Sequence, residues 1–243
     1  MSKALIPVII TRAQPGASET ATRVAKIGAA PVLSPVLDMV PDAGADLVAP
    51  ETLSGLIFTS ANGVRAYAER SHHRALPAWC VGPATAMAAK ASGFETVHES
   101  AGNAVDLADY IVAHHSRRQQ PLLHVANAAA KGDLNKNLTD AGVPVAFAPL
   151  YAMRAATHLS TPAHSVVTSR KYGIILIHSA MGAENFATLS QQLPIDHLTV
   201  VAISDAAARP LVPRNPRKLV IASAPNEDRL MNVLQSIIAT LSA

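Results

Sequence analysis

The strongest constraint on the fold of this chain is a regular alternation of short apolar runs with helical segments. The apolar runs lie at residues 5–11, 56–59, 79–81, 122–125, 174–177, 199–203 and 219–222. Stretches of helical pattern follow them, such as 16–27, which ends at Gly28. Strands that alternate with helices in this way form βαβ units, in which a parallel sheet is buried between helical layers. We therefore expect an α/β fold built from doubly wound parallel sheets.

Two extended segments interrupt this alternation. Residues 31–41 and 143–154 contain several prolines and no helical pattern, which is typical of edge strands and linkers. If both segments cross between domains, the chain leaves a first domain, builds a second one and returns. The expected division is a discontinuous domain of residues 1–33 and 156–243, an inserted domain of 46–145, and antiparallel linker strands at 34–45 and 146–155.

The two halves of the chain also resemble each other. Four pairs of segments correspond: 56–64 with 175–183, 81–86 with 203–208, 101–103 with 224–226, and 8–28 with 122–142. The first three pairs occur in the same order at nearly constant spacing, which indicates a repeated structural unit. We expect two similar domains joined by a two-stranded ladder, with the active site in the cleft between them.

Small polar residues stand where the predicted strands pass into helices. They include Ser60, Asn62, Thr85, Asn103 and Ser179. A helix N-terminus has unpaired N–H groups and a partial positive charge, so it binds anions. The carboxyl ends of parallel strands are also where ligands bind in open α/β sheets. The same residue types cap helices without any ligand, and the sequence leaves both interpretations open.

Composition excludes several other classes of protein. The net charge is only +3, and the basic residues are scattered, whereas nucleic-acid binders concentrate them in one stripe. Neither a G-x-G-x-x-G nor a P-loop motif is present. The single cysteine, Cys80, cannot form an intramolecular disulfide and fits a reducing cytoplasm. No apolar run is long enough to span a membrane. We expect a cytoplasmic protein that binds a small anion, and neither nucleic acid nor membrane.

Tyr151 stands in the second extended segment, within the sequence Leu150-Tyr151-Ala152. A tyrosine beside the predicted cleft is able to donate a proton or hydrogen bond to a leaving hydroxyl. Packing of the hinge with the hydroxyl in water is the other interpretation of this residue. The residues themselves do not decide between the two.

An ordered set of motifs resembles the uroporphyrinogen-III synthase family over nearly the whole chain. The motifs are 58–64 (FTSANGV), 81–86 (VGPATA), 102–104 (GNA) and the Leu150-Tyr151 pair. The resemblance implies an enzyme that expels the hydroxyl of hydroxymethylbilane, a linear tetrapyrrole, inverts its last ring and closes uroporphyrinogen III. It implies no cofactor and no metal. The family's linker tyrosine falls on Tyr151, which makes this residue the expected catalytic group.

The resemblance also assigns substrate contacts, at Thr11, Arg12, Ser60, Ala61, Asn62, Gly82, Thr85, Ala86, Asn103 and Ser179. Three candidates from less typical turns join them: Asn127, Lys131 and Ser204. The family pattern is broken at His178 and at Asp205, a carboxylate close to where a polyanion is expected.

Two alternatives to the enzyme remain. One is a non-catalytic or divergent two-domain protein that binds a tetrapyrrole or another small anion; the other, disfavoured by the motif order, is an unrelated hinged binding protein. Nothing in the sequence demands oligomers, so we expect a monomer.

Overall fold

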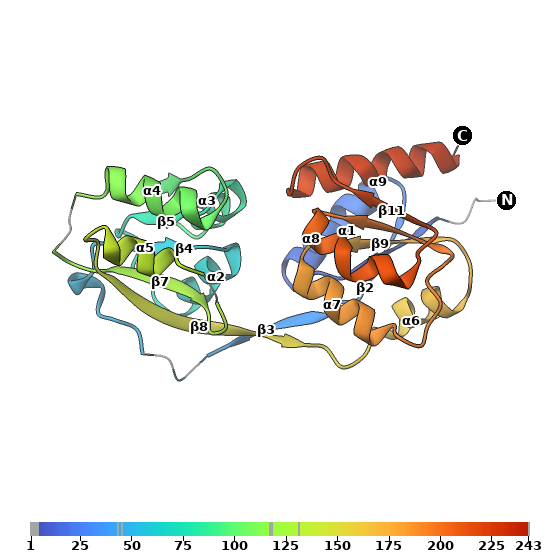
Figure 1. Cartoon of the computed structure of the whole chain (residues 1–243), viewed down its shortest axis with the longest axis horizontal. Coiled ribbons are helices and arrows are strands. Elements are labelled where there is room, and N and C mark those ends of the chain that lie inside the picture. Colours follow the sequence, from blue (N-terminus) through green and yellow to red (C-terminus); the bar gives the residue numbers. More distant parts are fainter. Residues whose placement is uncertain (1–4, 43, 45, 117–118, 131, 243) are drawn as a thin grey trace. The chain divides into compact units, whose positions relative to one another are not determined.

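The chain folds into two compact units. The structure, a computed structural model, describes residues 5–42, 44, 46–116, 119–130 and 132–242 (Figure 1). Unit 1 consists of Met1–Asp38 and Arg154–Ala243, and unit 2 of Met39–Met153. Both are α/β with parallel sheets, as the alternation of strands and helices predicts. Within the described residues, no helix is both long and apolar enough to cross a membrane.

Unit 1 is built on a five-stranded parallel sheet with the order β11-β10-β9-β1-β2. Its strands are β1 (Pro7–Ile10), β2 (Ala30–Leu33), β9 (Gly173–Ile177), β10 (Leu198–Ala202) and β11 (Lys218–Ile221). The three central strands are almost entirely apolar and buried. Such strands need helices on both faces of the sheet, since neither face tolerates water.

Helices cover this sheet in the positions that the alternation requires. They are α1 (Gly16–Lys26), α6 (Thr161–Thr168), α7 (Ala180–Leu189), α8 (Asp205–Ala208), the 3₁₀ helix η2 (Arg209–Arg214) and α9 (Glu227–Ser242). Val24 of α1 and Leu234 of α9 share one buried cluster with Val8 and Ile174 of the sheet. The apolar residues of α9 recur at helical spacing and form a stripe that faces the sheet. α7 contacts β9, and α8 contacts β10.

Unit 2 contains a six-stranded sheet with the order β3-β8-β7-β4-β5-β6. Its strands are β3 (Leu37–Pro41), β4 (Gly55–Phe58), β5 (Ala78–Cys80), β6 (Val97–Glu99), β7 (Leu122–Asn127) and β8 (Val145–Ala155). The pairs from β8 to β6 are parallel. The edge strand β3 is antiparallel to β8, because Asp42 N–H bonds the carbonyl of Leu150 while Ala156 N–H bonds that of Val36. The chain passes between the units within these two strands.

The unit 2 sheet is also covered on both faces. Its helices are the 3₁₀ helix η1 (Pro50–Thr52), α2 (Ala61–Arg70), α3 (Pro83–Ala91), α4 (Ala104–His114) and α5 (Leu134–Asp140). Val64 of α2 packs with Phe58 in one buried cluster, to which α3 also contributes. Leu107 of α4 and Leu138 of α5 pack with Ile57 in another. Consecutive strand residues point to opposite faces, so the neighbours Ile57 and Phe58 serve the two separate cores.

The strand orders of the two units correspond one to one. The series β8-β7-β4-β5-β6 of unit 2 matches β2-β1-β9-β10-β11 of unit 1. Each of the four repeated segment pairs falls on corresponding strands in these series or shortly after them. The repeat therefore predicts the shared topology correctly.

Some elements depart from the pattern read in the sequence. β6 and α6 are not predicted, because neither has a distinct apolar run. The helix after β10 is only the short α8, which continues as the 3₁₀ helix η2. Pro210 and Pro213 lack amide hydrogens and so cannot extend a regular α-helix. Residues 146–151, part of the expected linker of 146–155, pair with β7 as a strand of the unit 2 sheet.

Candidate functional site

Equivalent serines stand between a strand and the next helix in each unit, after β4 in unit 2 and after β9 in unit 1. Ser60 precedes α2 and Ser179 precedes α7, with nearly identical backbone angles. The Oγ of Ser60 accepts the N–H of Gly63 at 3.2 Å, and that of Ser179 accepts the N–H of Gly182 at 3.0 Å. A Cβ on Gly63 would lie 2.7 Å from the carbonyl oxygen of Val125, so only glycine lets α2 start this close to β7. Both serines are therefore helix caps.

Ser204 and Asn103 act in the same way. Ser204 Oγ accepts the N–H of Ala207, and Asn103 Oδ1 accepts the N–H groups of Val105 and Asp106, both at 2.9 Å. Capping thus accounts for the acceptor oxygens of these side chains. The serine hydroxyls keep their protons for donation, which is the hydrogen bond that a substrate carboxylate needs.

An irregularity in β8 places Tyr151 beside Ser60. The register of β7 and β8 is regular as far as Ala126, which pairs with Pro149, and then shifts so that Asn127 pairs with Tyr151. A bulge of this kind turns a side chain towards a direction that the regular pleat would not give it. The hydroxyl oxygen of Tyr151 lies 2.8 Å from Ser60 Oγ. Two residues that the sequence analysis proposed separately are therefore in direct contact.

The Tyr151 phenol is held in its protonated form. The residue is only 5% exposed, and burial raises the pKa of the phenol above 10. Hydrogen bonds from Ser60 and from the backbone of Asn127 oppose this shift without cancelling it. At neutral pH Tyr151 is therefore a hydrogen-bond donor, and Ser60 is placed to stabilise the phenolate if the proton leaves.

A buried histidine supports the same strand end. His124 on β7 lies with Nε2 at 3.3 Å from Thr59 Oγ1 and with Nδ1 at 2.7 Å from Asn135 Oδ1. Because the amide oxygen is an acceptor, Nδ1 carries the hydrogen and Nε2 accepts from Thr59. Burial lowers the pKa of His124, although the Asn135 hydrogen bond opposes the shift. The neutral imidazole therefore fixes Thr59, the residue before Ser60.

In unit 1, Arg12 belongs to a half-buried network centred on Glu227. Arg12 follows β1, and its Nη1 donates to Glu227 Oε2 at 3.0 Å. The other oxygen of the Glu227 carboxylate accepts from Thr20 Oγ1 at 2.8 Å. His178, at the end of β9, has Nε2 at 3.1 Å from Glu227 Oε2. Arg12, a predicted substrate contact, is thus already paired with the carboxylate of Glu227, the first residue of α9.

The charges of this network are set by burial and by the neighbouring groups. Burial raises the pKa of Glu227, but His178, Thr20 and Arg12 outweigh it and lower this pKa to about 2. Burial also lowers the pKa of His178, against the opposing effect of Glu227. At neutral pH His178 is therefore uncharged, Glu227 is ionised and Arg12 supplies the compensating positive charge.

The remaining predicted contacts of unit 2 are only partly available to a ligand. Gly82 is the N-cap residue of α3, whereas Thr85 and Ala86 in its first turn are buried. Asn62 is half-buried at the start of α2, and its Oδ1 accepts from Arg65 Nη1 at 3.3 Å. Ala61, beside it, is also half-buried.

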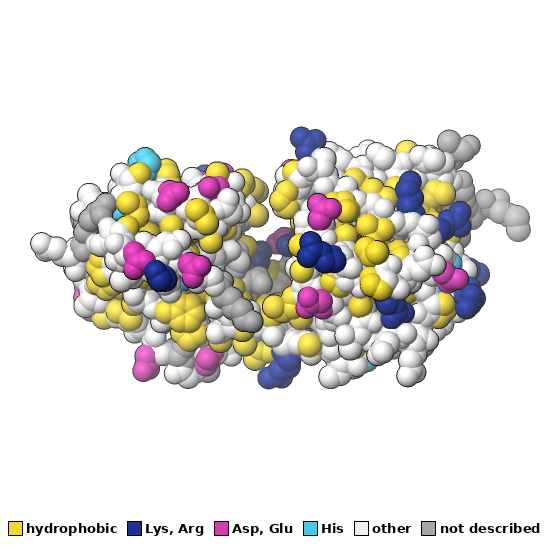
Figure 2. Space-filling view, viewed as in Figure 1, with side chains coloured by type: hydrophobic (Ala, Val, Ile, Leu, Met, Phe, Trp, Pro, Cys, Tyr) yellow, Lys and Arg dark blue, Asp and Glu magenta, His cyan; other side chains and the backbone are white. Residues whose placement is uncertain are grey.

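Three other predicted residues have different positions. Thr11 is 2% exposed and its hydroxyl donates to the carbonyl of Leu176 at 2.7 Å, so its side chain supports the sheet of unit 1. Asn127 Oδ1 accepts the N–H of Ala129 in the turn after β7. Lys131 lies outside the described residues. Lys and Arg are spread over the visible face of unit 1 rather than gathered in one band (Figure 2).

The polar groups that hold these residues in place are not predicted from the sequence. Thr59 and His124 stand in apolar strand patterns, where a polar side chain among buried neighbours is itself a signal of an internal hydrogen bond. Glu227 is an acid at the start of a helix, a position that the helix dipole favours for acids in any protein. His178 was noted only as a departure from the family pattern. No local signal connects Glu227 with Arg12.

Comparisons with known proteins agree on one family. The family model described as uroporphyrinogen-III synthase HemD matches residues 18–232. A structure of uroporphyrinogen-III synthetase from Helicobacter pylori has a TM-score of 0.66 at 15% identity, covering 96% of this chain and all of that one. A mutant uroporphyrinogen III synthase from Thermus thermophilus has a TM-score of 0.52 at 15% identity, with coverage of 98% and 99%. No curated protein sequence matches the chain.

The two kinds of comparison carry different weight. The structural likeness, at this low identity, supports the two-unit α/β fold. The family model matches most of the chain, including the Ser60 turn, Tyr151 and the Ser179 turn. The chain therefore belongs to the uroporphyrinogen-III synthase family, and uroporphyrinogen-III synthase is its function.

Proposed function

We propose that the chain is a cyclising hydro-lyase, which converts hydroxymethylbilane into uroporphyrinogen III with loss of water and inversion of the terminal pyrrole ring. The contact between Tyr151 and Ser60 is the observation that carries this proposal. It combines a protonated phenol with a hydroxyl that stabilises the phenolate, next to a helix N-terminus. A positioned proton donor of this kind accelerates the departure of a hydroxyl group from carbon at neutral pH.

The proposed first step is assisted departure of the terminal hydroxyl. The C–O bond breaks as the pyrrole nitrogen donates its electron pair, and Tyr151 gives its proton to the leaving oxygen, so that water departs. Ser60 then donates to the Tyr151 phenolate oxygen, which lowers the cost of placing a negative charge in a buried position. The terminal pyrrole ring then forms a carbon–carbon bond to the resulting cation and is inverted through a spiro intermediate. The phenolate takes up the proton that this pyrrole ring loses when it becomes aromatic again. Protons balance over the cycle.

The helix starts are proposed to hold the acetate and propionate groups of the bilane. Ser179 and Ser204 in unit 1 and Asn103 in unit 2 cap helices, so they present donors near partial positive charge. Several such donors would keep the flexible chain coiled with its ends close together, and this proximity is a large part of the catalysis required. The expectation that both units contribute to one cleft stays a prediction.

The alternative of a non-catalytic tetrapyrrole-binding protein is less favoured. The family match does not point to it, and the Tyr151–Ser60 pair is more than simple binding of carboxylates requires. The departures at His178 and Asp205 motivated that alternative. His178 is engaged with Glu227, and Asp205 is exposed at the start of α8.

The decisive experiment is an isomer-resolved assay. Hydroxymethylbilane, generated freshly by enzymatic synthesis, is mixed with the purified chain, and the type I and type III products are separated after oxidation. We expect type III to dominate. Formation of type I alone, at the spontaneous rate, would rule out the synthase reaction. A tight complex with the bilane under those same conditions would then favour the binding protein instead.

A further inference from the structure

A hollow lies in unit 1 at the opposite ends of the strands from Ser179. Its volume is about 520 Å³, and the residues that line it include Tyr172, Thr199, Arg217 and Lys218. Tyr172 directly precedes β9, Thr199 is near the start of β10, and Lys218 begins β11. In a parallel sheet these are the amino ends, whereas Ser179 follows the carboxyl end of β9. The two places are separated by the length of a strand, roughly 15 Å at the usual rise per residue.

The hollow is formed between the edge strand β11 and the C-terminal half of α9. Figure 1 labels these two elements in unit 1. Val220 of β11 and Val233 and Ile237 of α9 provide apolar walls, and all three are only half-buried. The α9 helix thus leaves apolar surface uncovered at this end of the sheet. A concave apolar surface of a few hundred cubic ångströms with a small number of polar groups is typical of small-molecule sites.

The polar groups of this hollow are cationic and held in position. Arg217 lies over the ring of Tyr172, with 5.5 Å between the guanidinium carbon and the ring centroid. The Tyr172 hydroxyl donates to Thr199 Oγ1 at 3.0 Å, which fixes the ring. The N–H of Arg217 bonds the carbonyl of Leu198, which holds its backbone against β10. Exposed Lys218 follows directly.

The local charge favours an anion. Among the described residues, no carboxylate forms an ion pair with Arg217 or Lys218. Asp196, which precedes β10 on the same edge, lies 3.9 Å from Arg170 instead. The helix dipole places about half a negative charge at the C-terminal end of α9. The two full positive charges of Arg217 and Lys218 are larger than this partial charge.

We propose that this hollow binds a small amphipathic carboxylate, with its apolar body against Val233 and Ile237 and its carboxylate on Arg217 and Lys218. A guanidinium accepts a carboxylate with two parallel hydrogen bonds, which makes it the better anchor of the two cations. The apolar wall selects against small inorganic anions, which would leave it exposed to water. The site is independent of the tetrapyrrole reaction, because none of its residues belongs to the candidate active site.

The test uses three molecules with the same eight-carbon body. Octanoate, octanamide and octylammonium are titrated separately into the ¹⁵N-labelled full chain, and the amide NMR shifts are followed. We expect octanoate to shift the amides of 217–220 and 233–241 with a Kd of about 1 mM or lower, and octanamide to bind about tenfold more weakly. Absence of shifts with octanoate, equal binding of the amide, or shifts confined to other residues would each overturn the proposal.

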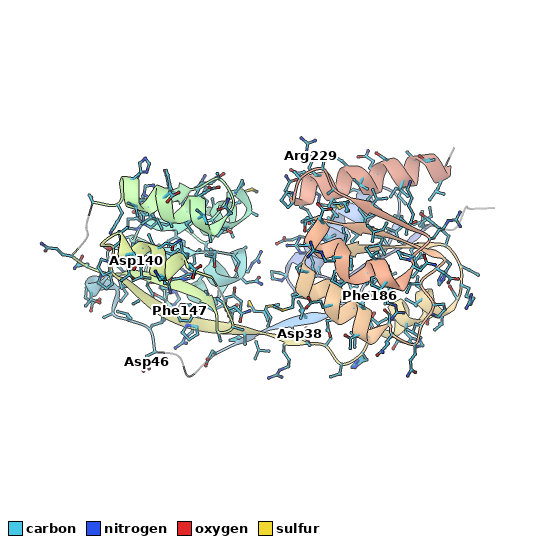
Figure 3. All side chains as sticks on the ribbon, in the orientation of Figure 1. Asp38, Asp46, Asp140, Phe147, Phe186 and Arg229 are labelled. Carbon is cyan, nitrogen blue, oxygen red and sulfur yellow. The ribbon has the colours of Figure 1, made fainter. Side chains whose placement is uncertain are left out.

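Variants separate the two parts of the site. Arg217→Glu with Lys218→Glu should abolish octanoate binding and allow octylammonium to bind instead. Ser236→Trp, an exposed position of α9 that lines the hollow, should block both ligands without changing the charge. The matched control is Lys26→Glu with Arg229→Glu, which makes the same change of charge on exposed residues outside the hollow; Arg229 lies at the amino end of α9 (Figure 3). Loss of octanoate binding in this control would overturn the site. Circular dichroism confirms that each variant is folded.

Discussion

The hydroxyl oxygens of Ser60 and Tyr151 lie 2.8 Å apart, although 91 residues separate them in the chain. Ser60 is placed by the turn between β4 and α2, and Tyr151 by the bulge in β8. Both belong to unit 2, so the contact does not depend on how the chain continues into unit 1. Ser60 is held as the N-cap of α2, and Tyr151 is held within β8. Side chains fixed by regular elements keep the geometry that repeated proton transfer needs.

Replacing Tyr151 with Phe should remove the proton donor and leave the fold intact. We expect kcat for type III product to fall by about tenfold or more, because general acid assistance is lost, with a smaller change in KM. The measurement is the isomer-resolved assay at saturating hydroxymethylbilane. Tyr110→Phe, on α4, removes a phenol hydroxyl elsewhere in unit 2 and should keep wild-type kcat. Wild-type kcat in Tyr151→Phe would exclude Tyr151 as the donor.

Replacing Ser60 with Ala tests the second member of the pair. The variant loses a helix cap, which should cost about 1 kcal/mol of unfolding free energy. Ser160→Ala removes the cap of α6 and should cost a similar amount with no loss of kcat. If Ser60 stabilises the phenolate, kcat of Ser60→Ala falls as well, and the double variant with Tyr151→Phe is no slower than Tyr151→Phe alone. Additive losses of kcat in the double variant would mean that the two hydroxyls act independently.

The Glu227 network predicts how stability depends on pH. The pKa of Glu227 is about 2 in the folded chain and near 4.5 when unfolded, so its contribution is complete above pH 4.5 and disappears as pH falls towards 2. The lowered pKa of His178 acts in the same direction below its unfolded value of 6.5. We expect denaturant unfolding, measured from pH 7 to pH 3, to show a steady loss of stability on acidification.

Glu227→Gln isolates the carboxylate from the rest of this dependence. The variant leaves Arg12 without its ion pair and should lose about 2 kcal/mol at pH 7. It should also show a flatter pH profile below pH 4.5. The matched control is Asp228→Asn, which breaks the surface pair with Arg23 and should change stability by less than about 0.5 kcal/mol. Equal effects of the two substitutions would contradict a special role for the half-buried Glu227 network.

Gly63→Ala tests the close approach of α2 to β7. Alanine normally stabilises a helix relative to glycine by about 1 kcal/mol. Here the new Cβ would lie 2.7 Å from the Val125 carbonyl, so overpacking should reverse the sign and destabilise unit 2 by about 1–3 kcal/mol. The thermal unfolding midpoint measures the change in stability. Gly28→Ala is not a suitable control, because Gly28 has a positive φ that would strain an alanine. A midpoint above that of the wild type would show that the backbone relaxes freely.

The fold followed largely from local information. Apolar runs such as 174–177 and 199–203 are buried on both faces. In a chain of alternating strands and helices, such runs indicate parallel sheets that are covered by helices. The repeat then indicated that the units share a topology, and their strand orders do correspond. β6 and α6 were missed because their burial comes from neighbouring elements rather than from an apolar pattern of their own.

The sequence by itself determined the class of fold, the capping residues and, through family resemblance, the importance of Tyr151. Only the tertiary structure decided which of these groups meet. Tyr151 reaches Ser60 because of a one-residue register shift. Arg12 reaches Glu227 across 215 residues because α9, which packs on β10 and β11, begins beside α1. Secondary structure depends on neighbours a few residues away, so it can be read from local pattern. Hydrogen bonds and ion pairs between distant segments depend on packing to within an ångström, and no local pattern records that.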